Sequence, residues 1–258
     1  MKLKKSIVAM ALVASMICGS TMNLWAAEMT VKNTAVQYEE ITDVEELIER
    51  AERGIDDLRD DTELKAETEC NLIQSARSRA ASVEGDIEGE LKSYTTSQRL
   101  GMEMVDGEMV DTYAAASIVT YGTGSHSASV SGVKLVSKIY LYVYSDGRAS
   151  IRMKNTSSNV SGGAQRLVMT NLVQQYTSGP QYTNGQTISY PSGTYTLSAP
   201  SGAANLWLTD ATAFCKLQDT VYMSNGASCV VKFIVNRNLN EYNAVSYTHL
   251  TLPTKRIV

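Results

Sequence analysis

The spacing of apolar residues divides the chain into a part with helical periodicity and a longer part with strand periodicity. Between residues 41 and 58, apolar side chains recur every three or four positions, and a second series of this kind runs from Leu64 to Leu91. Gaps of three and four place side chains on one face of an α-helix. The pattern therefore predicts two helices, arranged as an antiparallel pair, within residues 38–93.

A capping box marks the start of the first predicted helix. The Thr42 hydroxyl can accept from the amide of Glu45, and the Glu45 carboxylate can reach back to the amide of Thr42. The apolar stripe of both helices is narrow and rich in alanine. Since isolated helices of this length are marginal in water, we expect the stripe to pack on itself, on the following domain or on another chain.

From Leu100 onward the pattern changes to short runs of Val, Ile, Thr and Tyr separated by turn signals. The signals are Asp106-Gly107, Asp146-Gly147, Asn184-Gly185, Ser192-Gly193 and Asn225-Gly226. Strands at this spacing are typical of an antiparallel sandwich or barrel-like domain, which we place at residues 99–243. The predicted fold class is thus α+β: an N-terminal acidic helical segment of two helices, followed by an antiparallel all-β domain.

The strand register of one hairpin can be predicted from its side chains. A two-residue Asp146-Gly147 loop would mix apolar and polar residues on each face, whereas a three-residue loop sets Leu141 opposite Ile151 and Tyr140 opposite Arg152. A one-residue slip exchanges the faces, so the second register is favoured. It predicts four core residues: Ile139, Leu141, Val143 and Ile151.

The other face of this hairpin is the best candidate ligand-binding surface. It carries Tyr140, Tyr142, Tyr144, Arg148 and Arg152. Tyrosine rings offer flat apolar area with a hydroxyl at the rim, and arginine can stack on them or pair with carboxylates. Tyrosine and arginine are also ordinary cross-strand neighbours on half-exposed sheets. The alternative is therefore simple decoration, or a face that the helices cover with their carboxylates.

Charge divides the chain in the same way. Residues 38–92 hold 18 acidic and 7 basic residues, whereas residues 99–243 hold 8 acidic and 10 basic residues. Phosphate backbones require a basic surface, so nucleic acid is not an expected partner. The nearly neutral part is long enough to bury about two-thirds of its unfolded surface, which suffices for one independent core.

The first 26 residues predict export. Lys2, Lys4 and Lys5 precede an apolar run from Ile7 to Ile17, and Ala26 offers a small residue for cleavage. The segment resembles the signal peptides of Gram-positive bacteria. We therefore assign residues 1–26 to a signal peptide and 27–37 to a linker. The expected location is secreted or cell-surface, with no stable membrane span after cleavage.

The last residues have a different origin in this interpretation. Residues 245–254 resemble a reading frame through a sequencing-library transposon adapter, since back-translation gives the adapter sequence. We assign residues 244–258 to this artefact and expect the native chain to be truncated near Asn243. The tail therefore carries no information on fold or function.

Candidate chemistry is sparse. Cys215 and Cys229 form a disulfide candidate, but a simple hairpin at Asn225-Gly226 would set Cys229 near Val221 or Tyr222 instead. The chain has no metal-ligating motif, and the acidic run at residues 56–61 lacks the pattern of a calcium loop, so we interpret it as a solvated helix face. His126 lies in a Gly/Ser-rich stretch without a nucleophile motif. No catalytic residue and no cofactor is predicted.

Three functional hypotheses remain. The favoured one is a non-enzymatic extracellular or cell-surface module that binds a glycan or a protein ligand. The alternatives are an extracellular hydrolase whose catalytic residues lie partly in the missing C-terminus, and a secreted bacteriocin- or toxin-like protein. The oligomeric state does not follow from the sequence.

Overall fold

Strands make up most of the described structure. The computed structural model describes residues 37–62, 64–73, 90–122, 132–144, 150–175, 179–203, 206–207, 213–224 and 226–236. The predicted signal peptide, the adapter-like tail, His126 and Arg148 lie outside these residues. The elements in chain order are α1 (Val44–Glu52), α2 (Asp57–Thr62), β1 (Lys65–Ile73), β2 (Glu90–Val105), β3 (Glu108–Gly122), β4 (Val133–Tyr144), β5 (Ser150–Ser161), β6 (Ala164–Gln174), β7 (Gln181–Ser189), β8 (Gly193–Ser198), β9 (Leu206–Trp207), β10 (Phe214–Met223) and β11 (Ser228–Asn236).

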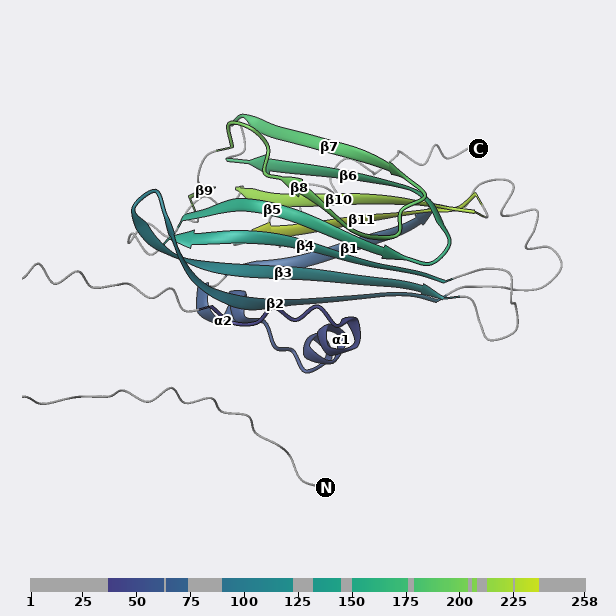
Figure 1. The fold of residues 1–258 in the computed structure, drawn as a ribbon, viewed down its shortest axis with the longest axis horizontal. Helices are drawn as coiled ribbons and strands as arrows, with labels where there is room; N and C mark the ends of the chain where they lie inside the picture. The colour runs from purple at the N-terminus through teal and green to yellow at the C-terminus, as the bar shows by residue number, and fades with distance from the viewer. Residues whose placement is uncertain are drawn as a thin grey trace, which may run out of the picture. The chain divides into compact units, whose positions relative to one another are not determined.

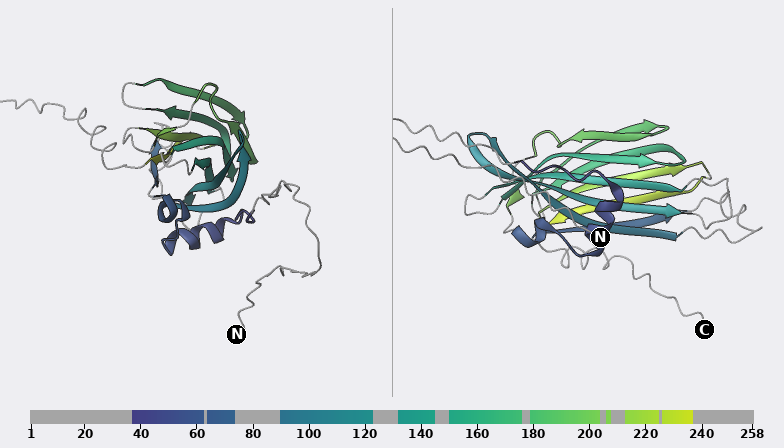
Figure 2. Two further views of the ribbon diagram at one scale, coloured as in Figure 1. Left: turned by 90° about the vertical axis from the view of Figure 1, so that its left-hand side faces the viewer. Right: turned by 60° about the horizontal axis from the view of Figure 1, so that its bottom comes forward.

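The strands form two antiparallel sheets that face each other in a sandwich-like arrangement (Figures 1 and 2). Sheet A has the strand order β2-β3-β4-β5-β8, with β9 paired to β5, and sheet B has the order β1-β11-β10-β6-β7. The first described strand of the chain is therefore hydrogen-bonded to the last one. The prediction of an antiparallel β domain is confirmed at this level.

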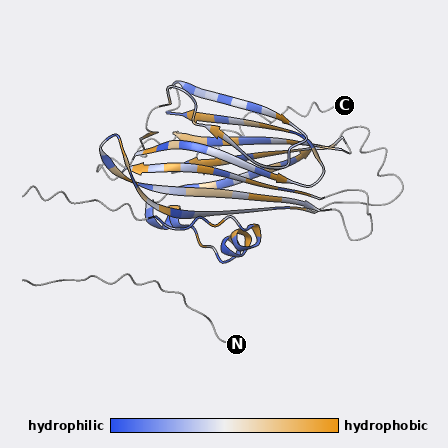
Figure 3. Ribbon diagram, viewed as in Figure 1, coloured by the Kyte–Doolittle hydropathy of each residue, from blue (hydrophilic) through white to orange (hydrophobic). Residues whose placement is uncertain are grey.

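The core lies between the two sheets. Many strands alternate buried, mainly apolar residues with more exposed ones, which appears as banding along the strands in Figure 3, whereas the middle of β3 is buried on both faces. Strand β10 is a clear example, since Cys215, Leu217 and Val221 are fully buried between more exposed neighbours. The largest fully buried side chain is Phe233 of β11.

The predicted acidic helical segment of residues 38–93 is largely wrong. Only nine residues form α1 and six form α2, while residues 65–73 and 90–93 lie in strands. In β1 the period is two: Ala66, Cys70 and Leu72 pack against the core, and Glu67 and Glu69 alternate with them. Pairing with β11 along nine residues outweighs the helical preference of Ala, Glu and Lys in this stretch.

Helix α1 begins one residue later than the capping box predicted. Its N-cap is Asp43, whose carboxylate accepts from the amide of Glu46 at 2.9 Å. Aspartate is at least as good an N-cap as threonine, so the acidic residue takes the position. Gly54, with φ +69°, follows the end of the helix. Leu47 then anchors α1 on the outer face of sheet A, where it packs with Ala116, Ile118 and Val136.

The acidic run of residues 56–61 is not simply a solvated helix face. Asp57 accepts from the Arg50 guanidinium at 2.5 Å and from the amide of Arg99 at 3.0 Å, and Asp61 accepts from the Tyr113 hydroxyl at 2.8 Å. Asp56 accepts from the Ser97 hydroxyl. The carboxylates thus attach α2 to β2 and β3. Burial, followed by the bond to Asp61, raises the pKa of Tyr113.

Two of the predicted turn signals, Asp106-Gly107 and Ser192-Gly193, lie at strand ends, whereas Asp146-Gly147 and Asn225 lie outside the described residues. Asp106 and Gly107 both have positive φ and close a two-residue hairpin between β2 and β3. Gly193 and Gly226, also with positive φ, stand beside the ends of β8 and β11. The prediction of a turn at Asn184-Gly185 is wrong, because the pair lies inside β7. A Cβ atom on Gly185 would meet the Met169 carbonyl oxygen at 2.8 Å, so glycine here allows the close approach of β6.

The β4–β5 hairpin keeps the predicted faces but not the predicted register. Leu141 pairs with Met153, Tyr142 with Arg152 and Val143 with Ile151, two residues away from the expected alignment. A shift of two preserves the faces, because side chains alternate with period two. Ile139, Leu141 and Ile151 are fully buried, and Val143 is half-buried against the same core, as expected.

The candidate disulfide is not formed. Cys215 pairs with Val235 and Cys229 with Val221, and both thiols are free. Six residues of strand separate them, about 20 Å at the usual rise per residue, far beyond the reach of a disulfide. The alternative pairing of Cys229 near Val221 is confirmed. Burial raises the pKa of the Cys215 thiol to about 12 and that of Cys229 to about 11.

Candidate functional site

The outer face of sheet A carries the candidate site. Helix α1 packs on β2 and β3 and reaches Val136 of β4, and the surface of β4 and β5 beyond it is polar and aromatic. We call this surface the tyrosine face; it consists of the outward side chains Lys138, Tyr140, Tyr142, Arg152, Lys154, Ser157, Asn159 and Thr194. These side chains point outward because they alternate with buried residues of β4 and β5.

A groove of about 190 Å³ lies between the tyrosine face and the segment before α1. We call it the tyrosine groove; its lining residues are Glu40, Thr42, Val44, Val136, Lys138, Tyr140, Ser157, Asn159 and Thr194. The amide of Asn159 donates to the Thr194 hydroxyl at 2.6 Å, which joins β5 to β8 at one wall. The groove thus combines one aromatic ring with hydroxyl and amide groups.

Glu40 joins the N-terminal segment to this face. Its carboxylate Oε1 accepts from Lys138 Nζ at 2.5 Å and from the Tyr140 hydroxyl at 2.9 Å. Lys138 Nζ also donates to the Ile41 carbonyl at 2.9 Å. Burial raises the pKa of Tyr140 to about 12, so its hydroxyl remains a donor at physiological pH.

A second carboxylate holds the neighbouring part of the face. Glu103 of β2 accepts from Lys154 Nζ at 2.8 Å, and the Lys154 ammonium lies 5.2 Å from the centre of the Tyr142 ring. Burial acts to raise the pKa of the Glu103 carboxyl, but hydrogen bonds from Lys154 and Tyr142 outweigh it and hold that pKa below its ordinary value. Arg152 donates to Asp106 at 3.3 Å.

The tyrosine face is therefore electrically balanced. Its three cations, Lys138, Lys154 and Arg152, each have a carboxylate partner in Glu40, Glu103 or Asp106. An anion entering the groove would have to compete with these carboxylates. The arrangement favours an uncharged ligand that makes hydrogen bonds and stacks on a ring.

Sequence reasoning located part of this face. Tyr140, Tyr142 and Arg152 lie on it; Tyr144 alternates with the core residues of β4 in the same way but is buried, with 7 % of its surface exposed. Glu40 and Glu103 were missed as site residues. They reach the face from segments about 100 and 50 residues away in sequence, and no local pattern links such positions.

The Glu40 ion pair gives a first testable prediction. Glu40→Gln is expected to lower the free energy of unfolding by about 1–3 kcal/mol, because it leaves the buried Lys138 ammonium without its carboxylate but with the Ile41 carbonyl. Glu45→Gln is the matched control. It breaks the exposed Lys134–Glu45 pair, whose loss costs about 1 kcal/mol or less. Urea unfolding of both variants at neutral pH measures the difference, and equal losses would contradict a structural role for Glu40.

Three acidic residues of the strands, Glu103, Asp111 and Asp219, do not form a pair of neighbouring free carboxylates. Glu103 pairs with Lys154, and Asp111 pairs with Arg99 at 2.5 Å. Asp219 is fully buried between the sheets. Within the described residues, no three His, Cys, Asp or Glu side chains gather where they could hold a metal ion.

Comparison with protein-family models, curated proteins and solved structures finds no match to this chain. Neither described helix has the length and apolar character needed to cross a membrane.

Proposed function

We propose that this chain is an exported, non-enzymatic interaction module that binds an uncharged glycan segment in the tyrosine groove. Export is proposed from the lysine-rich, apolar N-terminus. The observation that carries the binding role is the groove itself: a tyrosine ring and several hydroxyl and amide groups line one concave surface whose ionic groups are mutually paired.

Glycan chemistry suits this lining better than the other ligand classes. A sugar ring has an apolar face that can lie on a tyrosine and a rim of hydroxyls that can bond to Ser157, Asn159 and Thr194. A nucleic acid or another polyanion would meet the Glu40 carboxylate without a free cation beside it. A peptide could bond to the same hydroxyl and amide groups through its backbone. The experiment must therefore distinguish a peptide ligand from a glycan.

The test is binding of uncharged oligosaccharides to the full chain. Maltotetraose, cellotetraose and chitotetraose are titrated by isothermal calorimetry and by ligand-observed NMR. We expect at least one to bind, and Asn159→Ala to weaken that ligand about fivefold, since one lost hydrogen bond is worth about 1 kcal/mol. The matched control is Thr187→Ala, an exposed polar truncation on β7 of the other sheet, which should leave the affinity unchanged.

Two results would contradict the proposal. Binding that is equal in Asn159→Ala and in the native chain would place the ligand outside the groove. Binding of uncharged polar peptides, with no binding of any oligosaccharide, would show that the ligand of the groove is a peptide and not a glycan.

A further inference from the structure

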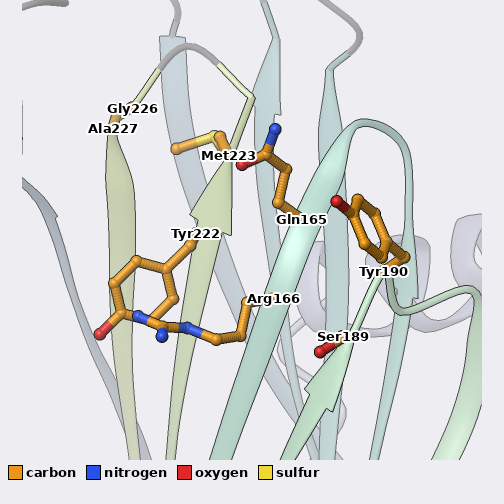
Figure 4. A pocket seen from close by; sticks show the side chains of 8 residues that line it. All are labelled: Gln165, Arg166, Ser189, Tyr190, Tyr222, Met223, Gly226 and Ala227. Atoms are coloured by element: carbon orange, nitrogen blue, oxygen red, sulfur yellow. The ribbon is translucent and has the colours of Figure 1, made fainter.

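A second hollow lies on the outer face of sheet B, away from the tyrosine groove. It has a volume of about 350 Å³ and is lined by Gln165, Arg166, Ser189, Tyr190, Tyr222, Met223, Gly226 and Ala227. Strand pairing sets Tyr222 of β10, Arg166 of β6 and Ser189 of β7 side by side in one row. Figure 4 shows the rings of Tyr222 and Tyr190 on opposite sides of the Arg166 and Gln165 side chains.

Arg166 differs from every other described arginine. Arg50, Arg53, Arg59, Arg99 and Arg152 each form an ion pair with a carboxylate. Among the described residues, Arg166 has no carboxylate at ion-pair distance. Its guanidinium instead lies 3.8 Å from the centre of the Tyr222 ring. Stacking on a ring fixes the plane of the guanidinium and leaves its N–H edge available to an incoming anion.

Tyr190 is held in a conformation that tyrosine rarely adopts. Its φ is +49°, in the left-handed region, and its amide donates to the Gln165 carbonyl at 2.7 Å. A non-glycine residue in this region costs about 1–3 kcal/mol. The ring gains little packing in return, because 78 % of the residue is exposed. Strain without compensating burial indicates that this ring serves an external contact.

We infer that this hollow binds a carboxylate-bearing sugar of the uronic-acid class. The sugar carboxylate pairs with the N–H edge of Arg166, and the pyranose face lies on the exposed Tyr190 ring. Gln165 and Ser189 provide polar groups for the hydroxyls. The volume lies at the lower end of the range for small-molecule sites, which suits a single sugar ring.

The lining distinguishes a sugar from an acidic peptide. Among the described residues that line it, Met223 is the one long aliphatic side chain, and none is Leu, Ile or Val. A peptide anchored by a carboxylate would find little apolar surface for its neighbouring side chains, whereas a sugar acid requires only the charge, the ring and the polar rim.

The test compares D-glucuronate with D-glucose by ligand-observed NMR and by titration of amide chemical shifts. The full chain is expected to bind glucuronate at least tenfold more tightly than glucose, with an affinity that falls as salt is raised. Shifted amides should lie in β6, β7 and β10. Equal binding of the two sugars would overturn the inference, and so would glutarate binding as tightly as glucuronate, since that marks a general carboxylate site.

Three variants locate the contacts. Arg166→Gln should weaken glucuronate binding at least tenfold, whereas Arg152→Gln, which removes an arginine from the other sheet, should change it less than twofold. Tyr190→Gly suits the positive φ and should leave the unfolding midpoint unchanged or raise it, yet weaken glucuronate binding severalfold. Retained affinity in either Arg166→Gln or Tyr190→Gly would overturn the inference.

The proposal of a sugar-acid site on sheet B and the proposal of a glycan site in the tyrosine groove can be tested separately. Asn159→Ala, which tests the groove on sheet A, should not change glucuronate affinity, because the two sites lie on the outer faces of different sheets. A loss of glucuronate binding in Asn159→Ala would assign the sugar acid to the groove and overturn the second site.

Discussion

Between about pH 4 and pH 7 the native chain is expected to lose about 2 kcal/mol of unfolding free energy that an Asp219→Asn variant keeps. Asp219 lies on β10 of sheet B and has no exposed surface. Its Oδ2 accepts from the Ser137 hydroxyl at 2.5 Å and from the Ser158 hydroxyl at 2.7 Å, both on sheet A. Oδ1 has no partner among the described residues.

The sign follows from the pKa in the folded and unfolded states. Burial raises the pKa of Asp219 to about 6, against an ordinary value of 3.8, although the two serine hydrogen bonds act to lower it. The folded state therefore binds the proton more tightly than the unfolded state. This contribution to stability is complete below the unfolded pKa and is lost as the pH rises through the folded pKa. A difference of about two pKa units corresponds to about 3 kcal/mol.

The measurement is urea unfolding of both proteins at several pH values from about 4 to 8. The difference between the two free energies cancels the titration of all other groups, so its change across about pH 4–6 reports Asp219 alone. Asparagine has the same shape and keeps an oxygen for the serine hydroxyls, which makes it the appropriate replacement. Parallel curves for the two proteins would show that Asp219 does not titrate in this window.

Ser137→Ala provides an internal check. It removes one hydrogen bond that lowers the pKa of Asp219, so the loss of stability should move to higher pH. Leu141→Val on the same strand changes only apolar packing and should lower stability by a similar amount at every pH.

Much of the β domain could be predicted because its signals are local. The Asp106-Gly107 turn requires two residues with positive φ, and the alternation in β4 fixes which side chains face the core. The same alternation in β10 sets Asp219 between the buried Leu217 and Val221. A carboxylate at an inward position is therefore visible in the sequence, and that is the signal which distinguishes Asp219 from the other acids.

The errors arise where distant segments decide the structure. Residues 65–73 contain Ala, Glu, Lys and Leu, which favour a helix, but hydrogen bonds to β11 about 160 residues later make them a strand. In the β4–β5 hairpin the alternation fixes the faces but not the alignment, since Val143 pairs with Ile151, two residues from the predicted register. The same holds for the candidate site. Alternation along β4 identifies Tyr140 and Tyr142, whereas the contact of Glu40 with Tyr140 joins residues 100 positions apart and has no local signal.

Phe233→Ala is expected to have the largest effect on stability, a loss of about 3–5 kcal/mol. Phe233 has no exposed surface, and it lies on β11 between β1 and β10. Removing its ring leaves a cavity beside three strands that join the beginning and the end of the described fold. A domain of this kind has a total stability of about 5–15 kcal/mol, so the loss is a large fraction of the whole.

Urea unfolding measures this prediction, with Val230→Ala as the matched control. Val230 is on the same strand but faces outward and is half-exposed, so its truncation should cost about 1 kcal/mol or less. If Phe233→Ala fails to fold, Phe233→Leu keeps the experiment informative, since it removes less volume and should lower the midpoint without changing the slope. Equal losses in Phe233→Ala and Val230→Ala would mean that β11 does not face the core as described. Because β1 pairs with β11, that result would also remove the basis for assigning residues 65–73 to a strand.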